Sequence, residues 1–124
     1  MGTISTTFSS FENQPLFAGT EVSALTTAVT LLAGQGKLNR GSVLGKITAS
    51  GKYALVSKAA SDGSQVASLV LSEDVDTTGA DVNAVAYKTG VFRHDALIIA
   101  AGDSVANHKE ELRNVNIFYK TDRG

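Results

Sequence analysis

A chain of 124 residues has the size of one domain with a modest core. Its 11 basic and 12 acidic residues leave a net charge of −1, too little positive charge for general binding to a nucleic-acid backbone. There is no cysteine, which excludes disulfide scaffolds, thiolate metal sites and cysteine nucleophiles. The first residues lack a basic and apolar leader pattern, and the longest apolar run, 96–101, is too short to span a bilayer. We therefore expect a soluble protein that stays where it is made.

The first predicted segment, residues 1–15, is a flexible arm. Its sequence "TISTTFSSFENQ" is rich in serine and threonine, and Pro15 ends the stretch. Such a segment cannot bury enough surface alone to offset an ordering entropy of about 1–2 kcal/mol per residue. A frayed terminus is the simplest interpretation. However, Ile4, Phe8 and Phe11 are spaced like apolar anchors on a polar tether, so these three residues and Pro15 are candidate contact residues.

From residue 16 onward the pattern predicts β structure. Short apolar runs with a period of two alternate with Gly, Ser, Asp and Asn, which favour turns. The runs with strand character are 20–32, 42–48, 52–57, 65–71, 82–90, 91–100 and 115–120. No internal repeat or linker divides the chain, so we expect a single β domain over 16–124.

The stretch "RGSVLGKITASGKY", residues 40–53, comes close to a phosphate-binding loop. Its spacing fails, because Gly41 and Gly45 enclose three residues where the motif needs four. In addition, Ile47 stands where the motif needs a metal-binding hydroxyl. We therefore interpret the stretch as part of a sheet.

The same glycines predict a β-hairpin. A loop of Ala49, Ser50 and Gly51 fits a three-residue connection with Gly51 in the left-handed conformation. Gly45, inside the preceding strand, predicts a bulge or a close backbone contact. Lys46 and Lys52 are expected on the solvent side of this hairpin.

One helix is expected near the carboxyl end of the chain. Asp103 or Ser104 can cap a helix over 105–115, and Glu110 can pair with Arg113 one turn on. The expected apolar face consists of Val105, Leu112 and Val115.

The acidic stretch "EDVDTTGADVNAV", residues 73–85, is similar to a calcium-binding loop. Asp74, Asp76, Thr78 and Gly79 match positions one, three, five and six of such a loop. Position twelve needs a bidentate glutamate and is Val85, so we interpret the stretch as a solvated turn.

The remaining candidate chemistry is sparse. His94 and His108 are far apart, with no third histidine to complete a zinc site, and His94 lies between Arg93 and Asp95 like a surface or interface residue. No serine lies in a Gly-x-Ser-x-Gly elbow. Adjacent acids on a turn, Glu73 and Asp74, are no evidence for paired catalytic acids. We therefore expect no enzyme activity, no cofactor and no metal.

Taken in order, several blocks of the sequence resemble one family. They are "AGTEV", "TLLAGQGKLNRGSVLGKITASGKYALV", "ASDGSQVASLVLSEDVD" and "AVAYKTGVFRHDALI", and together they span roughly residues 16–100. The most specific combination is Arg-Gly-x-Val-Leu-Gly at 40–45 followed by Asp-Gly-Ser-Gln at 62–65. These blocks are similar to those of the bacteriophage head decoration proteins, the family of phage lambda decoration protein D.

The resemblance implies a fold and a structural role. The fold would be mainly β: a small compact β-clip- or β-tulip-like barrel, with one short C-terminal helix and a flexible N-terminal arm. Homotrimers would sit at three-fold and quasi-three-fold positions of the expanded head and stabilise it against internal DNA pressure. The arm, residues 1–15, would bind the phage major capsid protein, and the residue pattern makes Ile4, Phe8, Phe11 and Pro15 the candidate contacts.

The resemblance also implies a location and a set of partners. The protein would be made in the host cytoplasm and act on the outer surface of the virion, with no nucleic acid, membrane or small-molecule substrate as partner. The Ser/Thr-rich arm and the acidic "SEDVD" turn depart from the lambda protein, so arm contacts do not transfer residue by residue. The alternative function is a small β module that binds a carbohydrate or other ligand on a loop face.

Overall fold

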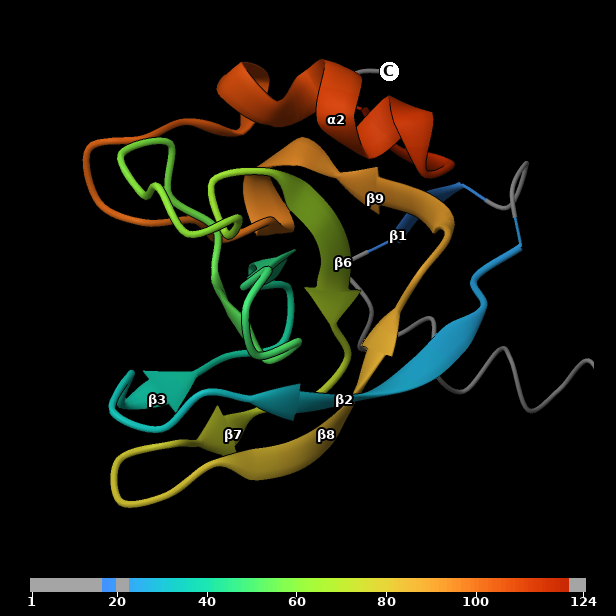
Figure 1. Ribbon diagram of the computed structural model, residues 1–124. Coiled ribbons are helices and arrows are strands. Elements are labelled where there is room, and N and C mark those ends of the chain that lie inside the picture. Colours follow the sequence, from blue (N-terminus) through green and yellow to red (C-terminus); the bar gives the residue numbers. More distant parts are fainter. Residues whose placement is uncertain (1–16, 20–22, 121–124) are drawn as a thin grey trace, which may run out of the picture.

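The structure of the chain is a computed structural model that describes residues 17–19 and 23–120 (Figure 1). Its strands, in chain order, are β1 (Phe17–Gly19), β2 (Thr26–Leu31), β3 (Lys37–Leu38), β4 (Val43–Lys46), β5 (Tyr53–Leu55), β6 (Ala67–Leu71), β7 (Val75–Asp76), β8 (Val82–Tyr87), β9 (Gly90–Arg93) and β10 (Ile117–Lys120). The helices are two short 3₁₀ helices, η1 (His94–Ala96) and η2 (Val105–His108), and the α-helix α2 (Lys109–Asn114). The prediction of a mainly β fold with one short C-terminal helix is therefore confirmed.

Five strands form a closed barrel in the order β2-β5-β4-β6-β8. The longest ladder joins β2 to β8, antiparallel, from Thr26 opposite Tyr87 to Leu31 opposite Val82. In both strands the burial alternates, so that Val29 and Leu31 of β2 and Ala84 of β8 point into the barrel. This alternation is the period of two that predicted the strands.

The seam between β2 and β5 is the weakest part of the barrel. These strands are parallel and are paired only at Leu31 and Tyr53. The side chain of Gln35 bridges the gap: its Nε2 donates to the carbonyl oxygens of Leu32 (2.8 Å) and Tyr53 (3.3 Å). Its Oε1 accepts the N–H of Leu55 at 2.8 Å. One side chain thus takes the place of the backbone hydrogen bonds that β2 and β5 do not make.

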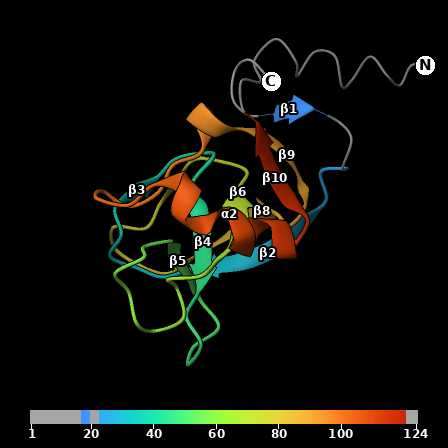
Figure 2. The same ribbon diagram turned by 90° about the horizontal axis from the view of Figure 1, so that it is seen from above.

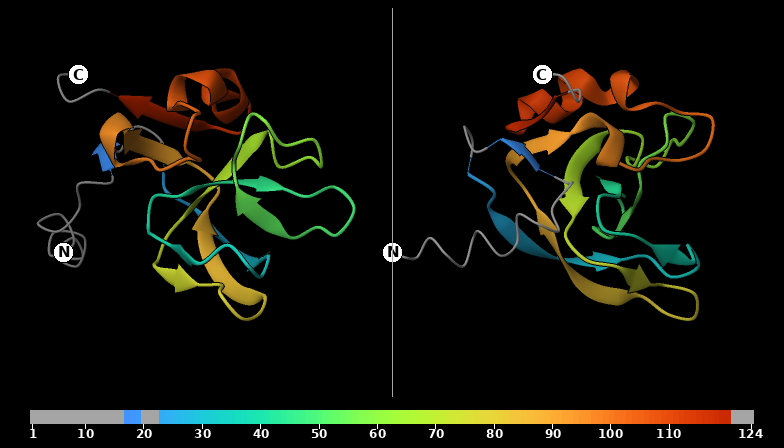
Figure 3. Two further views of the ribbon diagram at one scale, coloured as in Figure 1. Left: turned by 90° about the vertical axis from the view of Figure 1, so that its left-hand side faces the viewer. Right: turned by 180° about the vertical axis from the view of Figure 1, so that it is seen from behind.

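The predicted hairpin joins β4 to β5, antiparallel, with Lys46 opposite Tyr53. Gly51 has a φ of 76°, the left-handed conformation that was expected. The exposed loop projects from the body of the barrel (Figures 2 and 3). Lys46 is exposed, and Lys52 is partly exposed and pairs with Asp81 at 2.5 Å.

Gly45 confirms both of the expectations for its position. The register between β4 and β6 shifts between Leu44 and Gly45, as at a bulge. A Cβ at Gly45 would lie only 2.7 Å from the carbonyl carbon of Ser64. Nearby, the N–H of Thr48 donates to the carbonyl of Asp62 at 2.9 Å. The two most specific blocks of the family resemblance, 40–45 and 62–65, are therefore in direct contact.

The barrel wall separates two hydrophobic clusters. The inner cluster fills the barrel and includes Leu44 and Leu69, whereas the outer cluster includes Val43 and Val70. Strands β4 and β6 therefore contribute to both clusters, which explains the nearly continuous apolar run that predicted β6.

The outer cluster is covered by a three-stranded sheet, β1-β9-β10, and by α2. In this sheet β1 is antiparallel to β9, and β10 is parallel to it. Figure 1 shows α2 lying across one end of the molecule above β9 and β6, and Figure 2 shows β1, β9 and β10 side by side.

Two expectations about the carboxyl third need correction. Residues 91–100 do not continue as one strand: β9 ends at Arg93 and η1 follows. A short contact between Arg93 and Asp95 (3.0 Å) lies across this turn. Within 105–115 the first turn is the 3₁₀ helix η2. Val115 lies just beyond the end of α2, in the turn before β10, where it is 37% exposed and does not share the buried face.

Other features of the predicted helix are confirmed. Val105 and Leu112 are buried in the outer cluster, and Glu110 pairs with Arg113 at 3.4 Å. Asn116, with a φ of 66°, ends the helix in the left-handed conformation. Within residues 17–19 and 23–120, no helix is long and apolar enough to cross a membrane.

We predict that Gly45→Ala destabilises the barrel. The new Cβ would collide with the backbone of Ser64, and this contact cannot be relieved by a rotamer change. We expect a loss of about 1–3 kcal/mol or more in the free energy of unfolding, measured by urea denaturation. Gly79→Ala is the matched control, because its Cβ would meet no atom within 4 Å. Equal stabilities of the two variants would contradict the close contact.

We also predict that Gln35→Ala opens the seam between β2 and β5. It leaves the N–H of Leu55 without its acceptor, which costs about 1–3 kcal/mol when the group remains shielded from water. Hydrogen exchange of the Leu55 amide should accelerate in this variant. Gln65→Ala serves as the control, because Gln65 accepts only the nearby Gly63 N–H in the structure. If Gln65→Ala lowered the free energy of unfolding as much as Gln35→Ala does, the bridging role of Gln35 at this seam would be wrong.

Candidate functional site

The predicted contact residues lie at the amino end of the chain. Ile4, Phe8, Phe11 and Pro15 fall outside the described residues. The described chain begins at Phe17, two residues after Pro15, the last residue of the proposed arm. For this candidate site the structure therefore shows how the base of the arm, at Phe17, is joined to the domain.

Phe17 is fixed in a cluster of three aromatic rings. Its ring is stacked on Phe92, with 5.2 Å between centroids and an interplanar angle of 26°. It meets Tyr87 edge-on at 5.1 Å and 78°. Phe92 itself is fully buried, and both partner rings belong to or pack against the outer cluster. Aromatic pairs at these separations contribute about 0.5–1.5 kcal/mol each beyond their buried area.

Backbone pairing between β1 and β9 also fixes the position of Phe17. Phe17 of β1 is opposite Phe92 of β9, and Gly19 is opposite Val91. On its other side β9 pairs with β10, with Phe118 opposite Val91. A strand from each end of the described chain therefore flanks β9, and the base of the arm is a three-stranded sheet built on the outer cluster.

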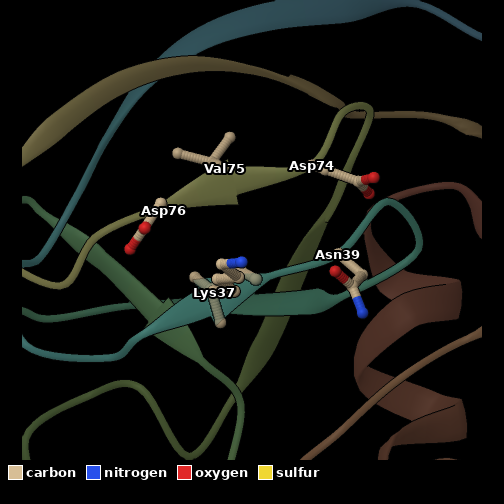
Figure 4. Close-up of a pocket in the computed structure, with 6 residues that line it drawn as sticks. Lys37, Asn39, Asp74, Val75 and Asp76 are labelled. Atoms are coloured by element: carbon tan, nitrogen blue, oxygen red, sulfur yellow. The ribbon is translucent and has the colours of Figure 1, made fainter.

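The acidic turn has its carboxylates engaged within the protein. Glu73 accepts the N–H of Val85 at 3.0 Å, and Asp74 accepts the N–H of Arg40 at 2.7 Å. Asp76 accepts both the N–H and the hydroxyl of Thr78, the side-chain bond being the largest of the effects that lower the pKa of Asp76. Figure 4 shows Asp74 and Asp76 at opposite ends of β7, with their carboxylates pointing apart. The turn is thus organised by backbone and hydroxyl donors.

Two open hollows lie on the surface near these strands. One, of about 380 Å³, lies between β3 and β7 and is lined by Lys37, Leu38, Asn39, Asp74, Val75 and Asp76 (Figure 4). The other, of about 450 Å³, is lined by Ala28, Val29, Thr30, Gly51, Tyr53 and Asn83. In the second hollow Thr30 donates to Asn83 at 3.0 Å, so part of its polar lining is already paired.

The two histidines have different surroundings. His94 is partly exposed and its ring lies 5.2 Å from that of Tyr119. His108 is buried, only 1% exposed, between the carboxylates of Asp103 and Glu111. Across the part of the chain that the structure describes, no three His, Asp or Glu side chains are arranged to hold a metal ion.

The sequence patterns did not predict the structural roles of Phe17, Gln35 and His108. Phe17 lies two residues beyond the proposed arm, and the sequence around it has no periodic pattern that marks it. Gln35 lies in the glycine-rich segment "GQG", where its bridging role depends on a strand 18–20 residues further on. For His108 a signal existed, because Glu111 lies three residues further along a predicted helix and hence on the same face.

Comparison with known proteins gives a family. No curated protein matches the chain. The family model described as bacteriophage lambda head decoration protein D matches residues 5–117, which cover most of the chain. The match includes the hairpin, the Gly45 contact and the strands β1 and β9 at the base of the arm. The chain belongs to the family of bacteriophage lambda head decoration protein D.

Proposed function

We propose that this protein is a capsid cement that binds the outer surface of the expanded phage head as a homotrimer. It occupies three-fold and quasi-three-fold positions and stabilises the head against internal DNA pressure. Residues 1–15 form the capsid-binding arm, and 16–124 form the decoration domain. The protein is made in the host cytoplasm and acts on the virion, as a structural protein and not as an enzyme. Membership of the head decoration family supports its association with the capsid.

The observation that carries the assignment of the arm is the anchoring of Phe17. A segment that precedes this residue leaves the domain at a fixed place, beside β9. Ile4, Phe8 and Phe11 can each contribute roughly 1.5–3 kcal/mol when buried on the major capsid protein. Ordering a dozen residues costs about 1–2 kcal/mol apiece, so one arm binds weakly unless backbone hydrogen bonds to a capsid strand are added.

Three arms on one trimer change this balance. After the first arm has docked, the others bind at an effective concentration near millimolar, and overall avidity rises by about 10²–10⁴. Trimerisation and arm binding are therefore two parts of one mechanism.

We predict that deletion of residues 2–14 removes stable association with heads and leaves the domain folded. The melting temperature should be nearly unchanged, because the aromatic anchor and both clusters lie in 17–120. Binding is measured by sedimentation of the protein with expanded, undecorated heads. Phe8→Ser with Phe11→Ser should reproduce much of the loss.

The matched control replaces polar arm residues, Thr7→Ala with Ser10→Ala, and should bind heads like the wild type. If the truncated protein saturates heads at wild-type affinity, the binding surface lies on the β domain. A protein that stays in the supernatant in every form would favour the ligand-binding alternative.

We predict that the full chain is trimeric, either free or on the capsid. Exposed apolar side chains are available for contacts between copies, since Leu25 is 51% exposed and Ile98 is 38% exposed. Analytical ultracentrifugation should then detect a species of three 12.9 kDa chains, in solution or after release from heads. A monomer in both states would defeat the trimeric mechanism.

A further inference from the structure

His108 lies at the centre of a buried charged cluster that the proposed function does not use. Its Nε2 is 2.7 Å from Oδ2 of Asp103, and its Nδ1 is 2.6 Å from Oε1 of Glu111. Carboxylates only accept hydrogen bonds, so both ring nitrogens must donate. With both carboxylates ionised, this geometry fits the doubly protonated imidazolium.

The two carboxylates connect three parts of the chain. Asp103, in the loop before η2, also accepts the N–H of Lys58 at 2.8 Å, from the loop after β5. Glu111, on α2, also accepts the N–H of Ala67 at 2.8 Å, at the start of β6. The two carboxylates that His108 holds thus tie the carboxyl-terminal segment to two places on the barrel.

The other charged groups of this segment do not face the ring. Glu110 and Arg113 are exposed and pair with each other, and Lys109 is exposed. From the barrel side, the groups that reach the two carboxylates are the backbone N–H groups of Lys58 and Ala67. The charges that act on His108 in the structure are therefore those of Asp103 and Glu111.

We propose that His108 is a protonated clamp that holds η2 and α2 against the barrel, and that it releases α2 from β6 when the ring loses its proton. A neutral ring keeps only one N–H and turns a lone pair toward one of the two carboxylates. The inference concerns the folded domain alone and does not rest on head binding.

The other hydrogen bonds of Asp103 and Glu111 determine which of the two carboxylates loses its bond to the ring. The side chain of Asp103 is 4% exposed and keeps three other donors, the N–H groups of Lys58 and Ser104 and the Nδ2 of Asn107. Glu111 is 31% exposed and keeps only the Ala67 N–H among the bonds that the structure gives it. The neutral ring should therefore keep its proton toward Asp103, while Glu111 turns to water and leaves Ala67.

The direction of the pH dependence follows from the same contacts. Burial opposes the charge on the ring, but the hydrogen bonds to Asp103 and Glu111 outweigh it and raise the pKa of His108 above its ordinary value of 6.5. A raised pKa in the folded state means that this stabilisation is fully present below the unfolded-state value and is lost as the pH rises through the folded-state value. Burial likewise opposes the charge on Asp103, but the bonds from Asn107, His108, Lys58 and Ser104 hold the pKa of Asp103 far below its usual range, so its contribution is lost only in acid.

The test is an NMR titration of the full chain, which contains only two histidines. His94→Gln assigns the two ring signals and serves as the matched control. We expect the His108 ring to titrate above 6.5. Over the same pH range the hydrogen-exchange protection factor of the Ala67 amide should fall at least about tenfold, while that of Lys58 is retained.

Glu111→Gln provides a second, nearly isosteric variant. In the structure a single oxygen, Oε1 of Glu111, meets both the Ala67 N–H and the ring. The amide oxygen of the variant can still accept the Ala67 N–H at that place, but it presents no full negative charge to the ring. We expect this variant to lower the pH at which His108 titrates and to remove the pH dependence of Ala67 protection, whereas His94→Gln retains it. Titration of His108 at or below 6.5, or Ala67 protection independent of pH in the wild type, would overturn the clamp.

Discussion

The structure depends on the closure of a five-stranded barrel from strands of only three to six residues. Such strands cannot pair along a full ladder, and each backbone N–H or C=O that remains needs a partner outside the ladder. Polar side chains supply these partners. Gln35 closes the seam between β2 and β5, Glu73 accepts from Val85 where β8 has lost its neighbour β6, and Asp81 accepts from Ala33 just beyond β2. In the described residues, no buried side-chain nitrogen or oxygen lacks a hydrogen-bond partner.

This use of polar side chains gives a structural role to many of the acidic residues of the chain. Asp74, Asp76, Asp103 and Glu111 each accept at least one backbone N–H, in addition to Glu73 and Asp81. A carboxylate that accepts an N–H from a distant part of the chain fixes a loop without a long strand or a helix. The acidic turn that resembles a calcium loop is therefore better explained as a set of backbone acceptors, because its carboxylates point to different donors and not to one centre.

Local patterns in the sequence predicted much of the fold. The patterns in 20–32 and 82–90 predicted two strands, which the structure places at 26–31 and 82–87. Gly45 predicted a bulge or a close backbone contact, and Gly51 predicted a left-handed hairpin turn. The contacts that complete the fold join distant residues, such as Gln35 with Leu55 and Asp103 with Lys58. No period or spacing encodes these pairs. The 3₁₀ geometry of residues 105–108 was also missed, because the sequence pattern carries no sign that the first turn is tighter than an α-helix.

The outer cluster connects the base of the arm with the carboxyl-terminal segment. Phe17 packs on Phe92, and the same cluster contains Leu112 of α2 and Ile117 of β10. A rigid base matters for multivalent binding, because an arm that starts from a fixed point samples less space than one that starts from a loose loop, and its effective concentration near the next site is higher. On the proposed function, the packing that holds α2 and β10 thereby contributes to avidity without touching the capsid. The domain then gives each arm a fixed starting point. Mutations far from residues 1–15 would affect head binding by changing the stability of the outer cluster.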